Sequence, residues 1–188
     1  LYRRFPTKEA LIDAIFEARL AEYVQVAEHA LEHEDGWGGL REFLEAALEL
    51  QARDRGLKEI LVSDRHGRQG VNAGRGRVGP LIQALVGRAQ REGKLRADVT
   101  PADIAMIMWS GGGVMDVSAA VAPNLWRRHL GLVLDALATP VPTRLVEPPL
   151  TRAQLRAAQS GSPRAARGLA RGVRARGESD VTSVPSAR

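Results

Sequence analysis

Leu1-Tyr2-Arg3-Arg4-Phe5-Pro6-Thr7-Lys8-Glu9-Ala10-Leu11 is the stretch on which the interpretation of this chain depends. Pro6 cannot continue an α-helix and restricts the residue before it to extended geometry, so a helix that contains Tyr2 ends here. Thr7 is a favourable N-cap residue, and Glu9 places a carboxylate in the first helical turn, where the helix dipole favours it. The sequence therefore predicts a tight joint between two helices.

One edge of this joint is rich in groups that bind anions. Tyr2 supplies a hydroxyl group, and Arg3, Arg4 and Lys8 supply positive charges. The free backbone N–H groups at the start of the second helix are also good phosphate donors. Two interpretations fit these residues: a phosphate-binding edge, or an ordinary capped helix start whose cations are solvated.

The joint resembles the end of the DNA-binding domain in TetR-type transcriptional repressors. In that family the recognition helix finishes with Leu-Tyr-x-x-Phe, and a short turn and Lys-Glu-x-Leu follow; all three parts are present in residues 1–11. The resemblance implies that Tyr2 and Lys8, with Arg3 and Arg4 beside them, bind DNA phosphates in the full-length protein. It also places Leu1 inside the recognition helix, so we expect an N-terminally truncated regulator that lacks most of its helix-turn-helix.

Apolar residues recur at spacings of three and four along most of the chain, which is the pattern of amphipathic helices. A long helix is predicted from Lys8 to about Glu32, and the resemblance implies that it connects the DNA-binding domain to the regulatory domain. Further helices are predicted over 40–53, within 56–64, from Pro80 to about Glu92, over 101–119 and over 125–138. The predicted fold class is all-α: a TetR-type C-terminal regulatory helical bundle, preceded by the end of a helix-turn-helix domain.

Two stretches set helix boundaries. Thr100-Pro101-Ala102-Asp103 is a strong helix start, with an N-cap threonine, a proline at the first position and a carboxylate at the third. Between Gly67 and Gly76 lie four glycines, counting both ends, and each weakens a helix by about 1 kcal/mol. A loop is therefore predicted from residue 65 to residue 79.

The last two predicted helices are unusually apolar. Gly111-Gly112-Gly113 lies inside the first of them, and such a triplet is costly unless another segment packs close to it. The resemblance implies that this pair packs against its twin in a symmetric homodimer; a buried pair inside one chain is the alternative. The candidate dimer residues are Gly111, Gly112, Trp126, Leu130, Val133, Leu134 and Leu137.

Large apolar side chains at Phe16, Phe43, Met106 and Trp109 are candidates for lining a small-molecule cavity between the helices. Ordinary core packing explains the same residues. The resemblance implies an effector in such a cavity, whose binding moves the two DNA-binding domains out of register with the DNA.

Enzymes leave recognisable residue patterns, and few are present. His29 and His33 have the spacing of two metal ligands on one helix face, but they lie among acidic residues at a helix end. Gly74-x-Gly76-x-x-Gly79 has dinucleotide-binding spacing without the strand that such a motif follows. We therefore expect neither an enzyme nor a metal or cofactor site.

Amino-acid composition limits the chemistry and the location expected of this protein. Cysteine is absent, which excludes disulfides and thiol catalysis. Neither an apolar run of about 18 residues nor the apolar core of a signal peptide is found, so a cytoplasmic protein without a membrane partner is expected.

The net charge of +5 is unevenly distributed. Residues 140–188 contain nine arginines and three acidic residues, a balance of +6, which leaves −1 for the rest of the chain. Proline, arginine, alanine and serine dominate this tail, so disorder is predicted, with a transient helix over 151–159. Its arginine series, Arg164, Arg167, Arg171, Arg174 and Arg176, either adds phosphate affinity or has no function.

These observations divide the chain into three parts. Residues 1–7 are the remnant of the DNA-binding domain, 8–139 the helical ligand-binding and dimerisation domain, and 140–188 the basic tail. The predicted function is that of a TetR-type regulator, a repressor that binds a small effector and forms a homodimer. The alternative is a stand-alone all-α ligand-binding or dimerisation module that does not bind DNA.

Overall fold

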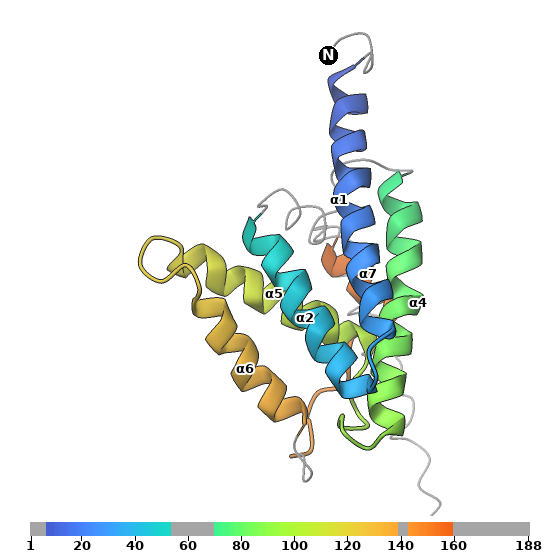
Figure 1. Ribbon diagram of the computed structural model, residues 1–188, viewed down its shortest axis with the longest axis vertical. Helices are drawn as coiled ribbons and strands as arrows, with labels where there is room; N and C mark the ends of the chain where they lie inside the picture. Colours follow the sequence, from blue (N-terminus) through green and yellow to red (C-terminus); the bar gives the residue numbers. More distant parts are fainter. Residues whose placement is uncertain (1–6, 54–69, 139–142, 160–188) are drawn as a thin grey trace, which may run out of the picture.

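The computed structural model describes residues 7–53, 70–138 and 143–159, and every regular element in these segments is an α-helix (Figure 1). The all-α prediction is therefore confirmed. The short helix predicted within 56–64 and the arginine series of the tail lie outside the described residues. The helices are α1 (Lys8–Leu31), α2 (Gly36–Arg53), α4 (Gly70–Arg91), α5 (Pro101–Ser118), α6 (Leu125–Leu137) and α7 (Arg152–Gln159).

Both predicted N-caps are confirmed. The Thr7 hydroxyl oxygen accepts a hydrogen bond from the Ala10 N–H at 3.0 Å at the start of α1. At the start of α5, the Asp103 carboxylate accepts from both the backbone N–H and the hydroxyl of Thr100, each at 2.7 Å. Such caps satisfy backbone groups that the first helical turn leaves free.

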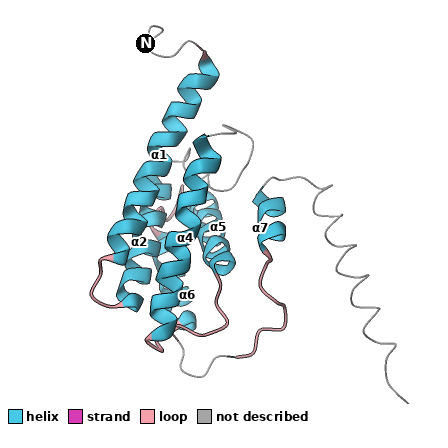
Figure 2. Ribbon diagram, turned by 90° about the vertical axis from the view of Figure 1, so that its right-hand side faces the viewer, coloured by secondary structure: helices cyan, strands magenta, loops and turns pink. Residues whose placement is uncertain are grey.

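The loop predicted before Pro80 is wrong over its last ten residues, because α4 already begins at Gly70 and Pro80 lies inside it. The early part of α4 runs beside α1 in both ribbon views (Figures 1 and 2), with Val78 buried and Arg77 3.3 Å from the Glu28 carboxylate. Packing against α1 outweighs the weak helix propensity of the glycines. Helix α2 likewise starts four residues earlier than predicted.

Helices α1, α2 and α4 pack together, and α5 and α6 form an antiparallel hairpin that crosses α2 (Figure 1). Tyr23 of α1 and Phe43 of α2 meet edge to face, with ring centroids 5.5 Å apart. The N-terminal part of α1 extends beyond the other helices (Figure 1). The bundle therefore holds one end of α1 and leaves the other end projecting.

Gly111, the first glycine of the α5 triplet, has an intramolecular explanation. A Cβ atom placed on Gly111 would lie 2.5 Å from Cδ2 of Leu48, so the Leu48 side chain of α2 fills the space beside Gly111 and would have to shift for any larger residue. A Cβ on Gly113 would have nothing within 4 Å. The expected close approach is thus found at Gly111, and its partner is α2 of the same chain.

Candidate functional site

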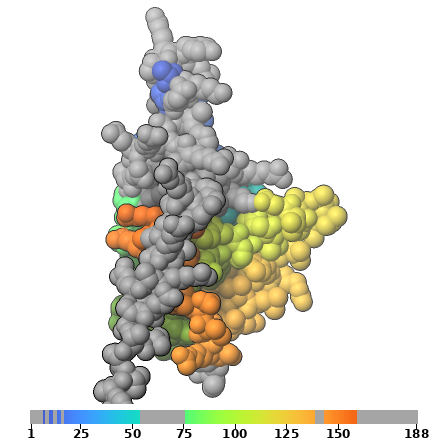
Figure 3. All heavy atoms as spheres, turned by 180° about the vertical axis from the view of Figure 1, so that it is seen from behind, coloured from blue at the N-terminus to red at the C-terminus, as the bar shows by residue number. Residues whose placement is uncertain are grey.

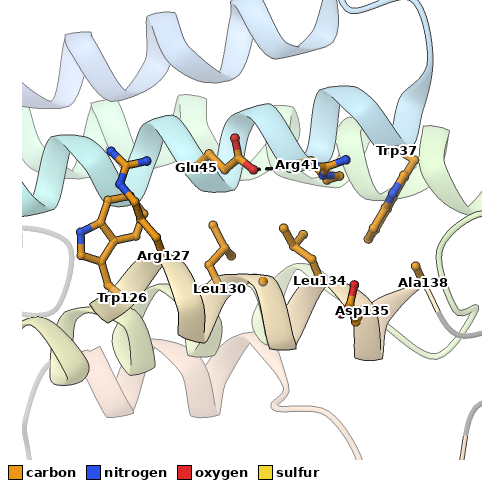
Figure 4. Close-up of a pocket in the computed structure, with 10 residues that line it drawn as sticks. Trp37, Arg41, Glu45, Trp126, Arg127, Leu130, Leu134, Asp135 and Ala138 are labelled. Carbon is orange, nitrogen blue, oxygen red and sulfur yellow. Dashed lines mark ion pairs between the residues drawn. The ribbon is translucent and has the colours of Figure 1, made fainter. Parts of the chain in front are cut away.

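A groove of about 290 Å³ runs between α2 and α6 (Figure 4). Leu130 and Leu134 point into it from α6 and form an apolar floor, and Trp37 of α2 stands at one end (Figure 4). Its lining residues are Trp37, Arg41, Glu45, Trp126, Arg127, Leu130, Gly131, Leu134, Asp135 and Ala138. We call this the α2–α6 groove.

Charged side chains form the rim of the α2–α6 groove. Arg41 lies 3.6 Å from Glu45, and the Arg127 guanidinium lies 4.4 Å from the ring centroid of Trp126 while also pairing with Glu49. Among the described residues, Asp135 has no ion-pair partner. An apolar floor with an aromatic end wall and a polar rim is the usual make-up of a small-molecule site.

Trp126 closes the other end of the α2–α6 groove. Its side chain is 1% exposed, and its indole N–H is buried without a hydrogen-bond partner among the described residues. Buried indole N–H groups usually find an acceptor, so burying this one without a partner lowers the folding stability locally. The packing of the large ring offsets that loss.

The four residues predicted to line an effector cavity do not line the α2–α6 groove. Phe43 is fully buried in the core, Met106 is 46% exposed on α5, and Trp109 is half-buried. Phe16 belongs to α1, but its side chain lies outside the described set. The sequence signal that was missed is the pair Trp37 and Trp126, each in the first turn of a helix in a chain with few aromatic residues.

Most of the candidate dimer residues are packed inside one chain. Gly111, Gly112, Trp126, Leu130, Leu134 and Leu137 are all buried, and Val133 is half-buried against the core. Gly111 lies against Leu48 of α2, and the α6 residues face the core of their own chain because the apolar stripe of α6 is also its core-facing stripe. The exposed surface of the hairpin is therefore made mainly of other residues, and the candidate dimer residues stay a prediction.

The exposed side of the hairpin is continuous across the two helices. Val117 and Leu132 are 84% and 61% exposed, and the Ser110 hydroxyl lies 2.9 Å from the His129 ring at the junction of the helices. Seen from behind, the hairpin projects to one side of the molecule (Figure 3). The outer hairpin face consists of Met106, Ser110, Gly113 and Val117 on α5 and Leu125, Arg128, Leu132 and Ala136 on α6.

The turn between α1 and α2 is fastened by the end of α4. The Arg88 guanidinium donates to the backbone carbonyls of Leu31 at 2.5 Å and His33 at 2.9 Å. Both carboxylate oxygens of Glu92 accept from the Gly36 N–H, at 2.8 and 2.9 Å. The Arg88 cation thus pairs with free carbonyl groups at the C-terminal end of α1. The Glu92 anion pairs with a free N–H group at the N-terminal end of α2, and the helix dipoles favour both arrangements. We call this cluster the α1–α2 hub.

Asp35 completes the α1–α2 hub. Its carboxylate accepts from the Gly38 N–H at 2.9 Å and from the Lys94 ammonium at 3.4 Å. The Gly38 hydrogen bond, with Lys94 as a smaller contribution, holds the pKa of Asp35 below its usual range. The stabilisation from this carboxylate is present above the pKa of an unfolded aspartate and is lost as the pH falls through the lowered folded value.

The predicted DNA contacts Tyr2, Arg3 and Arg4 lie outside the described residues, and Lys8 is the first residue of α1, with its side chain outside the described set. His29 lies 3.4 Å from Glu42 and 3.5 Å from Glu32. His33 accepts from the backbone N–H of Asp35. In the described segments, no group of three or more histidine, aspartate or glutamate side chains is placed to hold a metal ion.

The all-α bundle with a projecting first helix fits the class that the sequence resembles, the helical bodies of TetR-type transcriptional regulators. Residues 37–139, more than half of the chain, match the family described as "Transcriptional regulator SbtR-like, C-terminal domain". The chain belongs to this family and is a TetR-type regulator. The matched region begins at Trp37 and includes both sides of the α2–α6 groove.

A search of curated proteins found no match to the chain. Within the described segments, no helix combines the length and the apolar character needed to cross a membrane.

Proposed function

We propose that this TetR-type regulator is a dimeric repressor whose helical body binds a small-molecule effector and passes the signal through α1 to the DNA-binding domain. The observation that carries the proposal is the α2–α6 groove, which begins at Trp37, one residue after the Gly36 N–H held by Glu92. An effector acts only through its different affinities for two conformations. A ligand against Trp37 is well placed to bias the α1–α2 hub and hence the direction of α1.

In this proposal, each of the three consecutive segments of the chain has its own role. Residues 1–7 are the end of the DNA-binding domain, and Tyr2, Arg3, Arg4 and Lys8 contact DNA phosphates in the full-length protein. Residues 8–139 sense the effector and dimerise, and residues 140–188 are a basic tail. The action is binding rather than catalysis.

A second copy of the chain is the proposed partner of the outer hairpin face. Large apolar side chains at 84% and 61% exposure, Val117 and Leu132, stand on two adjacent helices. A C2 dimer needs one patch that is complementary to itself, and an exposed apolar stripe across two helices meets that need. Gly113 on the same face leaves room for a close approach, because no atom of the described residues beyond its own helical backbone lies within 4 Å of its Cβ position.

The double substitution Val117→Glu and Leu132→Glu is expected to convert a dimer into a monomer, because it brings four carboxylates into a symmetric apolar interface. Size-exclusion chromatography with light scattering measures the mass. The control is the double substitution Leu145→Glu and Val146→Glu, which adds the same two charges at side chains that are 52% and 94% exposed outside the hairpin. A monomeric unmodified chain, or a double variant that remains dimeric, would refute this assignment of the interface.

Filling the α2–α6 groove is expected to block ligand binding without damaging the core. Gly131 lines the groove, and nothing lies within 4 Å of its Cβ position, so Gly131→Trp puts a large side chain into open space. The fluorescent aromatic dye anilinonaphthalene sulfonate serves as the probe, and its affinity is expected to fall about tenfold or more, since the variant ring occupies the ligand volume. Fluorescence titration gives the affinity.

The matched control for the groove is Gly76→Trp, at an exposed position of α4 where nothing lies within 4 Å of a Cβ. It adds the same ring at a site remote from the groove, so the dye affinity should stay unchanged. Equal affinities for the two variants would show that the dye, and by extension an effector of that shape, binds elsewhere.

A further inference from the structure

A second groove, also of about 290 Å³, lies between α1 and α2 and is distinct from the proposed effector site. Its floor contains Val26, Ala46 and Leu50, and its rim carries Glu22 and Glu42, both half-exposed. Gln25 and His29 complete the lining. We call it the acidic α1–α2 groove.

The charge around the acidic α1–α2 groove is only partly compensated: Arg19 lies 2.8 Å from Glu22, whereas Glu42 has no arginine or lysine partner among the described residues. Residues 7–53 contain eleven Asp and Glu residues against four Lys and Arg, a net charge of −7. Among the described residues that line the groove, the basic side chain is His29, which lies between Glu42 at 3.4 Å and Glu32 at 3.5 Å. Within the segments that the structure describes, no lysine or arginine forms an ion pair with Glu32 or Glu42.

The complementary charge is carried by the end of the same chain. Residues 160–188 contain six arginines and two acidic residues, and four of the arginines, Arg164, Arg167, Arg171 and Arg174, are spaced three, four and three apart. An arginine has an apolar stem and a charged planar head, so it fits a groove with an apolar floor and a carboxylate rim. We propose that residues 160–188 dock in the acidic α1–α2 groove of their own chain, with arginine stems on Val26 and Leu50 and guanidinium groups at Glu22 and Glu42.

The length of the tail permits this contact. The segment follows α7, which ends at Gln159, and its 29 residues span up to about 95 Å when extended. A domain of this size has a radius of gyration of about 15 Å, so the tail can reach any face. Tethering gives the tail an effective concentration in the millimolar range, so weak, salt-sensitive ion pairs are sufficient for docking.

Docking of the tail on α1 has a regulatory consequence. Helix α1 begins at Lys8, directly after the basic residues that resemble a phosphate-contacting edge. The bound tail neutralises the acidic α1–α2 groove, which lies on α1 after this basic stretch. A polyanion such as DNA competes for the same arginines, so the tail passes from the groove to the polyanion when one is present.

Distance measurement on the full chain tests the proposal. Because the chain has no cysteine, Gln25→Cys in the groove and Ala170→Cys in the tail give two unique spin-label sites. Dilution with excess unlabelled chain ensures that the measured distances join two labels on the same chain. A short-distance population is expected at about 50 mM salt and should largely disappear at about 500 mM. Glu42→Lys is expected to reduce this population several-fold, and Glu22→Lys serves the same purpose if the first variant folds poorly.

The control is Asp135→Lys, which makes the same change of charge on α6, outside the acidic α1–α2 groove. It should leave the short-distance population unchanged. A broad distance distribution at low salt would overturn the proposal. So would an equal effect of Glu42→Lys and Asp135→Lys, because the attraction would then be general, or a tail that becomes ordered only when random-sequence DNA is added.

Discussion

Gly39→Ala is expected to lower the free energy of unfolding by about 2–3 kcal/mol, although alanine is the better helix former by about 1 kcal/mol. A Cβ atom at Gly39 would lie 2.3 Å from the carbonyl oxygen of Ala30 in α1. A backbone atom cannot rotate away as a side chain can, so α1 and α2 must separate. Gly36 is under the same constraint, with its Cβ position 2.7 Å from the backbone nitrogen of Ala89.

Gly76→Ala is the matched control, because it makes the same chemical change where nothing lies within 4 Å of the new atom. It should raise the free energy of unfolding by up to about 1 kcal/mol through helix propensity alone. Urea unfolding followed by far-UV circular dichroism measures both variants. Two stabilised variants would mean that α1 and α2 cross less closely than the structure describes.

The two capped helix starts, at Thr7 and Thr100, and the all-α fold class follow from local chemistry, and the sequence was sufficient to predict them. Thr7 accepts from the backbone N–H of Ala10, and Asp103 accepts from the backbone N–H of Thr100. The partners in each pair are three residues apart, so the local sequence is enough to predict both caps. The start of α4 was missed because glycine propensity is local, whereas the stabilising contacts of Val78 and Arg77 come from α1. Propensity gave the wrong answer where packing decided the outcome.

The same limit applies to the candidate site. Trp37 and Trp126 belong to one groove although 88 residues separate them, and the Gly36–Glu92 bond joins residues 56 positions apart. Periodicity correctly marked Leu130 and Leu134 as one apolar stripe. It does not say whether such a stripe faces its own chain or a second copy, because both surfaces select the same residue types. The dimer residues therefore remain a prediction, and the proposed interface uses the exposed residues instead.

Arg88→Ala is expected to cost about 2–3 kcal/mol of folding free energy, since hydrogen bonds to charged groups are worth roughly that much and the carbonyls at the end of α1 would lose their partner. Arg88 bonds two of these carbonyls at 2.5 and 2.9 Å. Arg88→Lys should recover part of the loss, because an ammonium keeps the charge but not the planar fork. The control is Arg91→Ala, three residues further along α4 at an exposed side chain, which should change stability by about 0.5 kcal/mol or less.

Amide hydrogen exchange at the end of α1 separates a purely structural role of Arg88 from a role in signalling. In the unmodified chain, a ligand in the α2–α6 groove should change the protection of α1 amides, because Trp37 adjoins the turn that Arg88 and Glu92 hold. In Arg88→Ala the ligand should still bind, but the change in α1 should be lost. If α1 responds equally in both proteins, the signal does not depend on the Arg88 contacts of the α1–α2 hub, and it reaches α1 through other contacts of the helical core.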